Sequence, residues 1–325
     1  MKRKFLTTAL TALLAVSTLS ACGANYKVSF NDYWKKSVFD SAQQTLTETC
    51  EYDVGFESTA VGNFSVAYQN GTYKTTFIST TTTEQQVEYT FTTEFSIQVQ
   101  YKVGNDTSQW LDDSAYTSVT FHSSKDGLMP IRSEKRMVSH SPLNISPSSL
   151  EVAYKKYDQT IVTQYDEKCE SATATITDNK LTQDNVTTQT FDISHSKYNY
   201  LDNESLLFAL RCINTDATTS TKFNIYSPLD ADMQKFSVNF NTATSKDFTF
   251  SINGESAVSR SVSYYPVGLQ LSANTNTGTL KSIWIAKRTD AQNNTYRNVI
   301  LRQETPLAYA LGTLTFSLKS INFAN

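Results

Sequence analysis

The sequence predicts an all-β protein: a large antiparallel sheet, curled or half-barrel in shape, with one or two short helices. Three observations predict this class: recurrent alternation of apolar and polar residues, an abundance of Thr and Ser, and an aromatic content of 12%. Thr and aromatic residues suit strands, and alternation turns one strand face to the core and the other to water. With 39% hydrophobic residues among 325, the chain can bury a sizeable core.

The clearest alternation runs from Val87 to Tyr101, where apolar residues occupy one parity and polar residues the other. Thr93 alone interrupts the apolar series. A period of two predicts a strand with one dry face in an antiparallel sheet, and a strand this long must twist or curl strongly. Shorter copies of the pattern occupy residues 52–56, 64–68, 115–121, 150–154, 172–176, 236–240, 248–252 and 314–318.

Turn residues separate several of these segments. Asn70-Gly71 and Asn253-Gly254 each lie between alternating segments, and both central positions of a type I′ hairpin turn need positive φ. We therefore expect a hairpin at each pair, and Lys125-Asp126-Gly127 is a weaker third candidate.

Two short helices are expected to cover an apolar sheet face. Asp202 can cap a helix over residues 205–213 that places Leu206, Leu210 and Ile213 on one side. Asn31 or Asp32 can cap another, with Trp34, Val38 and Ala42 on one stripe.

The body of the protein is expected to span residues 31–325. Candidate boundaries between two β halves are the Ser-, Pro- and Asn-rich residues 140–149 and the polar residues 214–220. Neither stretch is long enough to require independent domains, so both one body and two halves remain open.

The amino-terminal residues have the pattern of a secretory signal. Three basic residues precede an apolar run over residues 5–16, which is shorter than the roughly 20 residues that span a bilayer. The following Leu19-Ser20-Ala21-Cys22 resembles the lipobox of bacterial lipoproteins. The resemblance implies that residues 1–21 are removed as a signal peptide and that Cys22 carries acyl chains such as palmitate. The alternative is an ordinary secretory cleavage site beside a chance Cys.

The lipobox resemblance also implies a location. Several acyl chains on one residue anchor a protein stably. Residues 22–30 would then be a lipidated tether, and the body would lie at the extracytoplasmic face of the cell membrane. Whether the cell also has an outer membrane stays open.

A second resemblance rests on a helical segment, Leu201 to Phe208, followed by strand segments at Ile283 to Ile285 and Val299 to Arg302. With these segments, residues 197–323 resemble bacterial envelope proteins built as half-barrels around a helix, such as the carriers and acceptors of lipoproteins. The resemblance implies a concave apolar face that can hold an acyl chain or another apolar ligand.

Three cysteines follow Cys22, namely Cys50, Cys169 and Cys212. One disulfide with a free thiol, in any of three pairings, and three buried thiols are both compatible with the sequence. Their wide spacing excludes a CxxC redox or zinc motif.

Charge and motifs exclude several functions. A net charge of -3 with dispersed basic residues disfavours nucleic-acid binding. No metal or cofactor motif occurs, so we expect no cofactor. Each of His122, His140 and His195 has Ser neighbours, but Ser is common in this chain and adjacency is not catalytic geometry.

The acidic pairs Asp112-Asp113 and Asp230/Asp232 are candidates for glycosidase carboxylates, although Asp at strand ends usually forms turns. Arg132, Glu134 and Arg136 share one strand face and indicate a wetted exterior. Trp110, after a polar turn, is either a loop-tip aromatic or a residue folded back onto the sheet rim.

These observations favour binding or scaffolding over catalysis. The first hypothesis is a membrane-anchored lipoprotein that binds an apolar ligand, or an envelope partner, in a cleft with few convergent charges. The second is a structural or interaction lipoprotein without a pocket. The third is an envelope hydrolase, which requires acids or a Ser/His pair that converge in one groove.

Overall fold

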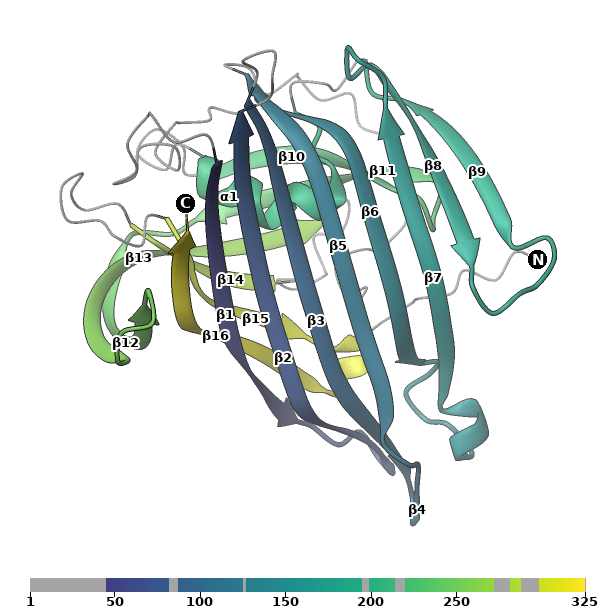
Figure 1. Ribbon diagram of the computed structural model, residues 1–325. Coiled ribbons are helices and arrows are strands. Elements are labelled where there is room, and N and C mark those ends of the chain that lie inside the picture. The colour runs from purple at the N-terminus through teal and green to yellow at the C-terminus, as the bar shows by residue number, and fades with distance from the viewer. Residues whose placement is uncertain are drawn as a thin grey trace.

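The computed structural model describes residues 45–81, 87–124, 127–194, 199–213, 220–271, 281–287 and 298–324. Within these ranges the strands form one 16-stranded sheet, which confirms the predicted all-β class (Figure 1). The strands are β1 Thr45–Ser58, β2 Phe64–Thr81, β3 Val87–Val103, β4 Asp106–Thr107, β5 Leu111–Ser124, β6 Gly127–Pro142, β7 Tyr154–Tyr165, β8 Ser171–Asp178, β9 Val186–Asp192, β10 Ser220–Ser227, β11 Asp232–Phe240, β12 Thr244–Ile252, β13 Val258–Leu271, β14 Lys281–Ala286, β15 Ile300–Pro306 and β16 Gly312–Ala324.

The strands are arranged mostly as antiparallel neighbours. Their order is β10-β11-β13-β14-β15-β16-β1-β2-β3-β5-β6-β7-β8-β9, while β4 pairs with β3 and β12 with β13 and β16. The first and last of the described strands, β1 and β16, pair from Thr47 opposite Ala324 to Ser58 opposite Gly312. This central pairing joins the early strands to the late strands in one continuous sheet.

Strand β3 has the alternation expected from its sequence. Seven of its inward residues are buried, namely Tyr89, Phe91, Phe95, Ile97, Val99, Tyr101 and Val103, and Thr93 occupies the same face. Thr93 is accommodated there because its hydroxyl hydrogen-bonds with that of Thr117 on β5 (2.8 Å).

The prediction of a hairpin at Asn70-Gly71 is wrong. These residues lie inside β2, where Gln69 pairs with Gln98 and Thr72 with Ser96, so β2 contains one extra residue. Asn70 has the positive φ (53°) that suggested a turn, but here it forms a β-bulge.

The second hairpin is confirmed. Asn253 and Gly254 have φ of 50° and 77° and join β12 to β13, and Glu255 N donates to Ile252 O (3.0 Å). Strands β5 and β6 also form a hairpin in which Ser124 pairs with Gly127, although residues 125–126 are outside the described ranges.

A further correction concerns residues 150–154. The alternation there predicted a strand, but Leu150–Val152 form a short 3₁₀ helix, η1, and β7 begins only at Tyr154. Three residues of alternation are too short to distinguish a strand from a single turn of helix.

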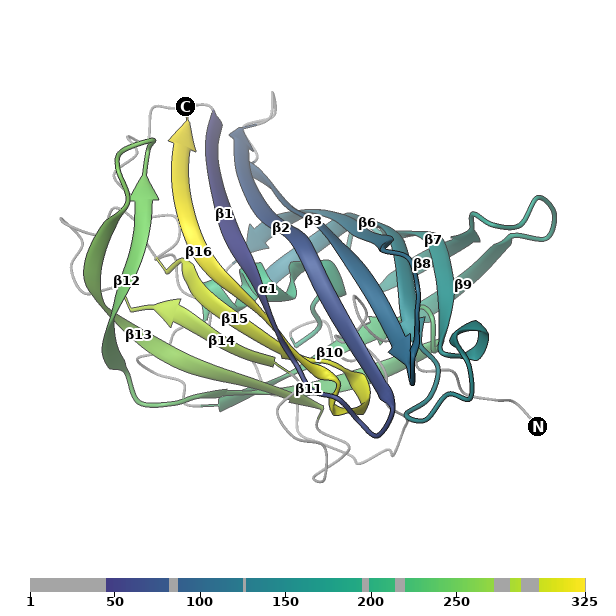
Figure 2. The ribbon, with the colours of Figure 1, turned by 90° about the horizontal axis from the view of Figure 1, so that it is seen from below.

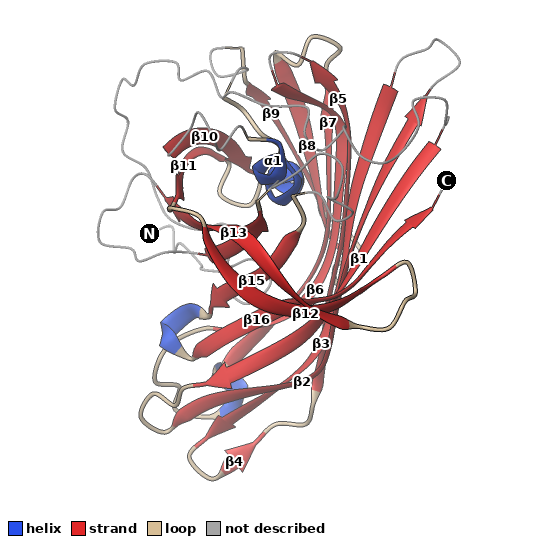
Figure 3. Cartoon of the chain, turned by 90° about the vertical axis from the view of Figure 1, so that its left-hand side faces the viewer, coloured by secondary structure: helices blue, strands red, loops and turns tan. Residues whose placement is uncertain are grey.

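The helix predicted after Asp202 is present. A 3₁₀ turn, η2 (Asn203–Ser205), leads into α1 (Leu206–Cys212), and the Asp202 carboxylate accepts a hydrogen bond from Glu204 N (2.8 Å). Every residue of α1 is buried, not only the predicted stripe, because the sheet curls around the helix instead of leaving one side in water (Figure 3). The helix expected at residues 31–42 lies outside the described ranges.

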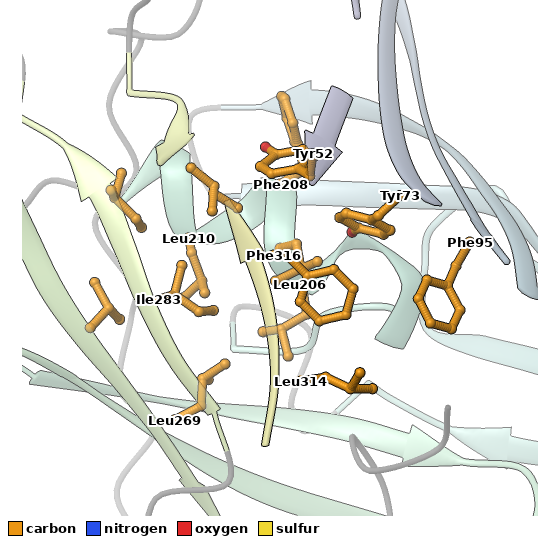
Figure 4. Packing of buried hydrophobic residues seen from close by; sticks show 14 of the residues in the cluster. Tyr52, Tyr73, Phe95, Leu206, Phe208, Leu210, Leu269, Ile283, Leu314 and Phe316 are labelled. Atoms are coloured by element: carbon orange, nitrogen blue, oxygen red, sulfur yellow. The ribbon is translucent and has the colours of Figure 1, made fainter. Parts of the chain in front are cut away.

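Aromatic rings pack α1 against the sheet. Phe208 lies 4.6 Å from Phe77, 5.5 Å from Phe91 and 5.4 Å from Phe121, measured between ring centroids. Figure 4 shows Phe208, Leu206 and Leu210 directed from the helix into this core, which also includes side chains from the late strands. One main core therefore fills the interior of the curl.

The two end strands of the sheet, β9 and β10, contact each other through side chains. The rings of Phe191 and Tyr226 stack with centroids 3.7 Å apart, and the Tyr226 hydroxyl donates to Gln189 Oε1 (2.9 Å). We call the buried residues around this contact the edge cluster, comprising Tyr165, Cys169, Ala172, Ala174, Phe191, Ile193, Tyr200 and Tyr226. Figure 2 shows the resulting curl, with α1 inside it.

Candidate functional site

A cavity of about 110 Å³, here called the α1 pocket, lies between the start of α1 and the inner face of the sheet. Early strands, late strands and the helix all contribute to its wall. The lining residues are Tyr73, Thr93, Phe95, Ala115, Thr117, Lys135, Asn203, Glu204, Leu206, Leu207, Lys281, Gln303, Thr305, Leu314 and Phe316.

One part of the α1 pocket is apolar. Phe316 lies 5.0 Å from Tyr73 and 5.8 Å from Phe95 between ring centroids, and Leu206 and Leu314 complete this wall (Figure 4). Burial raises the pKa of the Tyr73 hydroxyl, so this group is neutral at physiological pH. This wall can accommodate a hydrocarbon group.

The other part of the α1 pocket contains three charged residues. Lys135 Nζ lies 3.6 Å from Glu204 Oε1, and both side chains are largely buried. Lys281 is only 6% exposed. Burial, together with repulsion from Lys135, lowers the pKa of Lys281 to about 8. The sequence predicted a cleft with few convergent charges, so these groups are a departure from that expectation.

Two polar atoms of the lining residues, Thr305 Oγ1 and Asn203 Oδ1, lack a hydrogen-bond partner among the described residues. Gln303 Nε2 makes no hydrogen bond of normal geometry there, although the Gln303 side chain acts on the Tyr73 hydroxyl as a hydrogen-bond partner and lowers the pKa of Tyr73. Gln303 is 1% exposed. Buried polar atoms in folded proteins are nearly always hydrogen-bonded, by protein or by something bound. Their concentration at one cavity distinguishes the α1 pocket from ordinary core.

A smaller cavity of about 40 Å³ adjoins this site and shares Lys135, Asn203 and Glu204 with it. At its wall, Asp202 Oδ2 accepts hydrogen bonds from Ser133 (2.6 Å) and Tyr165 (2.5 Å). Burial and the charge of Glu204 raise the pKa of Asp202 to about 6, although these hydrogen bonds oppose the rise. The network links the helix cap to the edge cluster.

Asp113 and His140 form a buried pair that the sequence did not predict. The ring Nδ1 and the backbone N of His140 lie 2.7 and 2.8 Å from Asp113 Oδ1. The neighbouring serines, Ser139 and Ser141, hydrogen-bond to each other (3.0 Å). Asp113 and His140 meet because β5 and β6 pair, although 27 residues separate them in sequence.

The other acidic candidates lie on surface turns and strand ends. Asp112 is exposed and accepts from Gln98 Nε2 (3.0 Å). Asp230, in the β10–β11 turn, accepts from Ser227 Oγ (2.9 Å) and Gln234 Nε2 (3.0 Å), and Asp232 begins β11. Asp230 therefore has the turn-forming role that Asp commonly has at strand ends.

Of the remaining candidates, those that the structure describes do not line the α1 pocket. Glu134 accepts from Arg132 Nη2 (2.8 Å) and Arg136 Nε (2.6 Å), and these hydrogen bonds lower the pKa of Glu134. Trp110 is half-buried. His122 Nδ1 lies 3.3 Å from the carbonyl of Val87, while His195 is outside the described ranges.

Cys50, Cys169 and Cys212 are buried thiols that form no disulfide with one another, which is the second of the two predicted alternatives. In the part of the chain that the structure describes, no cluster of three metal-ligating side chains occurs. Across the same ranges, no helix has the length and apolarity needed to cross a membrane. Cys22 and the proposed tether precede the described residues.

Sequence reasoning missed Lys135, Lys281, Gln303 and Thr305. A signal for Lys281 existed, because it shares its parity with the buried residues Ile283 and Ile285. A charged residue on the apolar parity of a strand is expensive to bury, and such positions are often functional.

The fold and the cavity together define a curled β-sheet protein with an internal pocket beside a buried helix. No family model and no curated protein matches the chain. A similar solved structure is the crystal structure of a β-barrel-like protein of the domain of unknown function DUF1849 from Brucella abortus. It has 8% sequence identity and a TM-score of 0.45, and the match covers 86% of this chain and 98% of that chain.

Proposed function

We propose that this protein binds a small ligand whose apolar part lies in the α1 pocket. The observation that carries the proposal is a cavity with an aromatic and aliphatic wall, bordered by buried polar atoms that lack partners among the described residues. A pocket that is mainly apolar with a few polar groups is typical of small-molecule sites.

The size of the cavity restricts the ligand. An apolar cavity of about 150 Å³ holds benzene. A cavity of about 110 Å³ therefore accommodates roughly four or five carbon atoms. This volume fits a short acyl chain or a small branched group.

We further propose that binding occurs outside the cytoplasm, with the protein attached to the cell membrane through acylated Cys22. The proposal rests on the basic, apolar and lipobox segments of residues 1–22. Cys22→Ala is expected to leave an unprocessed precursor that takes up no acyl label. Incorporation of label equal to that of the wild type would falsify the assignment.

Ligand binding is tested by extracting small molecules from the purified full-length protein and identifying them by mass spectrometry. Ala115→Phe places a ring in the α1 pocket and is expected to abolish the enrichment of a bound compound. Ser114→Phe, one residue away and exposed on the outer face, is the matched control. Equal recovery from the two variants would contradict a ligand in this pocket.

A further inference from the structure

Lys281 is a buried cation for which the described residues provide no counter-ion. The centroid of the Phe316 ring lies 6.0 Å from Lys281 Nζ, and the charged group that lowers the pKa of Lys281 is another cation, Lys135. Salt bridges involving Lys281 are absent within the described ranges, whereas Lys135 pairs with Glu204. Burial of an uncompensated ammonium is costly, so this position requires an explanation.

The charges that line the α1 pocket itself leave the ammonium of Lys281 without a counter-ion. Lys135 and Lys281 contribute two positive charges, and Glu204, which pairs with Lys135, contributes one negative charge. The Asp202 carboxylate lies at the adjoining cavity, where Ser133 and Tyr165 donate to it. A ligand with a single negative charge would neutralise the site. A doubly charged phosphate would leave a buried negative charge in its place.

Hydrogen-bond donors lie on the strand next to Lys281. Gln303 on β15 pairs with Ile283 on β14, and Ile283 is two residues from Lys281, on the same face. Gln303 Nε2 and the Thr305 hydroxyl, two residues apart on β15, are both buried. Thr305 Oγ1 lacks a partner among the described residues, and Gln303 Nε2 makes no hydrogen bond of normal geometry there, its side chain acting only on the nearby Tyr73 hydroxyl. An ammonium, an amide N–H and a hydroxyl suit the oxygens of a carboxylate.

The apolar wall begins directly beside these donors. On β16, Phe316 pairs with Gln303 and Leu314 pairs with Thr305. A carboxylate held by the donors would therefore have its hydrocarbon part against Leu314 and Phe316. Both lie in the wall shown in Figure 4.

We propose that the ligand of the α1 pocket is a short-chain or small branched monocarboxylate, with its carboxylate bound by Lys281, Gln303 and Thr305. This inference rests on the proposed function, since it names the chemical class of the ligand for the same pocket.

The test is isothermal titration of the full-length protein with pentanoate and with the neutral analogues pentanol and pentanamide. We expect pentanoate to bind at least tenfold more tightly than either analogue. Lys281→Met is expected to weaken pentanoate binding about 10- to 100-fold, because a hydrogen-bonded charge pair is lost. Lys319→Met, which removes an exposed lysine of β16, is the matched control and is expected to leave affinity unchanged.

A second variant separates lost recognition from lost folding. Gln303→Leu keeps the size of the side chain and removes its donor, so affinity for pentanoate is expected to fall about 3- to 10-fold. Circular dichroism and the melting temperature of each variant report on the fold.

The outcomes distinguish this inference from the proposed function. If pentanol binds as tightly as pentanoate, and Lys281→Met has no effect, the carboxylate inference is wrong and the apolar pocket stands. If none of the three compounds binds the wild type, the carboxylate inference is overturned, and the proposed function is then decided by the extraction experiment with Ala115→Phe and Ser114→Phe.

Discussion

Arg211 of α1 donates hydrogen bonds to both carboxylate oxygens of Glu48 on β1, at 2.6 and 3.0 Å, and both side chains are buried. Arg211 Nε also donates to the carbonyl of Asn298 (2.9 Å), whose side-chain amide donates back to the carbonyl of Arg211 (3.2 Å). These bonds attach the helix to the first strand and to the segment before β15. They fix the end of α1 opposite the pocket.

Removal of one partner of this pair is expected to destabilise the fold strongly. Arg211→Met leaves the Glu48 carboxylate buried without its cation, which costs about 3 to 5 kcal/mol. Urea denaturation measures the loss. The double variant Glu48→Leu/Arg211→Met should recover most of it, and Lys74→Ala, which breaks the exposed pair with Glu94, should cost less than about 1 kcal/mol. Equal effects of the buried and exposed changes would contradict the account.

Lys281→Met is expected to stabilise the protein while it weakens ligand binding. The pKa of Lys281 is lowered to about 8, so below pH 8 the buried ammonium lowers the free energy of unfolding by about 3 kcal/mol. Between about pH 8 and 10 the unfolded chain binds more protons than the folded protein. The stability of the wild type relative to the variant should therefore rise as the pH increases through this range. Urea unfolding at pH 7, 9 and 10 measures this difference. A less stable variant at pH 7 would argue that Lys281 is structural.

Asp202 is expected to produce the opposite pH dependence in the acidic range. Because its pKa is raised to about 6, the folded protein binds more protons than the unfolded chain between about pH 4 and 6. The contribution of Asp202 to stability therefore falls as pH rises through this window, by about 3 kcal/mol in total. Asp202→Asn, which retains a good N-cap, should remove this dependence.

The measurement for Asp202 is the difference in unfolding free energy between wild type and Asp202→Asn at pH 4, 5, 6 and 7. Asp112→Asn removes a negative charge from the surface and is the control. If the difference in unfolding free energy between wild type and Asp202→Asn stays constant from pH 4 to 7, the buried Asp202 carboxylate is not the cause of the pH dependence.

The bulge in β2 provides a test of close packing. A Cβ at Gly71 would lie 2.7 Å from Val54 Cβ and 3.2 Å from Ile97 Cδ1, whereas at Gly55 no atom lies within 4 Å. Gly71→Ala is therefore expected to cost about 1 to 3 kcal/mol, as overpacked substitutions do. Gly55→Ala should be nearly neutral. Thermal unfolding of the two variants measures the difference, and equal melting temperatures for Gly71→Ala and Gly55→Ala would contradict close packing at the bulge.

Local pattern predicted much of the fold because alternation reports directly on burial. Neighbouring residues in the sequence were enough to predict both the inward face of β3 and the helix cap at Asp202. Local sequence could not predict the pairing of β1 with β16, because this pairing joins residues far apart in the chain. The wrong prediction at Asn70-Gly71 also depends on a distant partner. A residue with positive φ occurs in hairpin turns and in β-bulges, and only the pairing with β3 shows that Asn70 forms a bulge.

The candidate site was less predictable than the fold. Lys281 and Lys135 look like ordinary surface lysines until the inward parity of their strands is taken into account. Their meeting with Glu204 depends on the sheet curling around α1, which brings β6, β14 and η2 to one cavity. Local sequence contains the charges but not this convergence.

The central claim is that a small ligand lies inside the curl beside α1, and intermolecular nuclear Overhauser effects test it most directly. With methyl-labelled leucines and bound pentanoate, the account predicts contacts from the ligand chain to the methyl groups of Leu206, Leu207 and Leu314. Contacts only to exposed leucines such as Leu181 or Leu229 would contradict it.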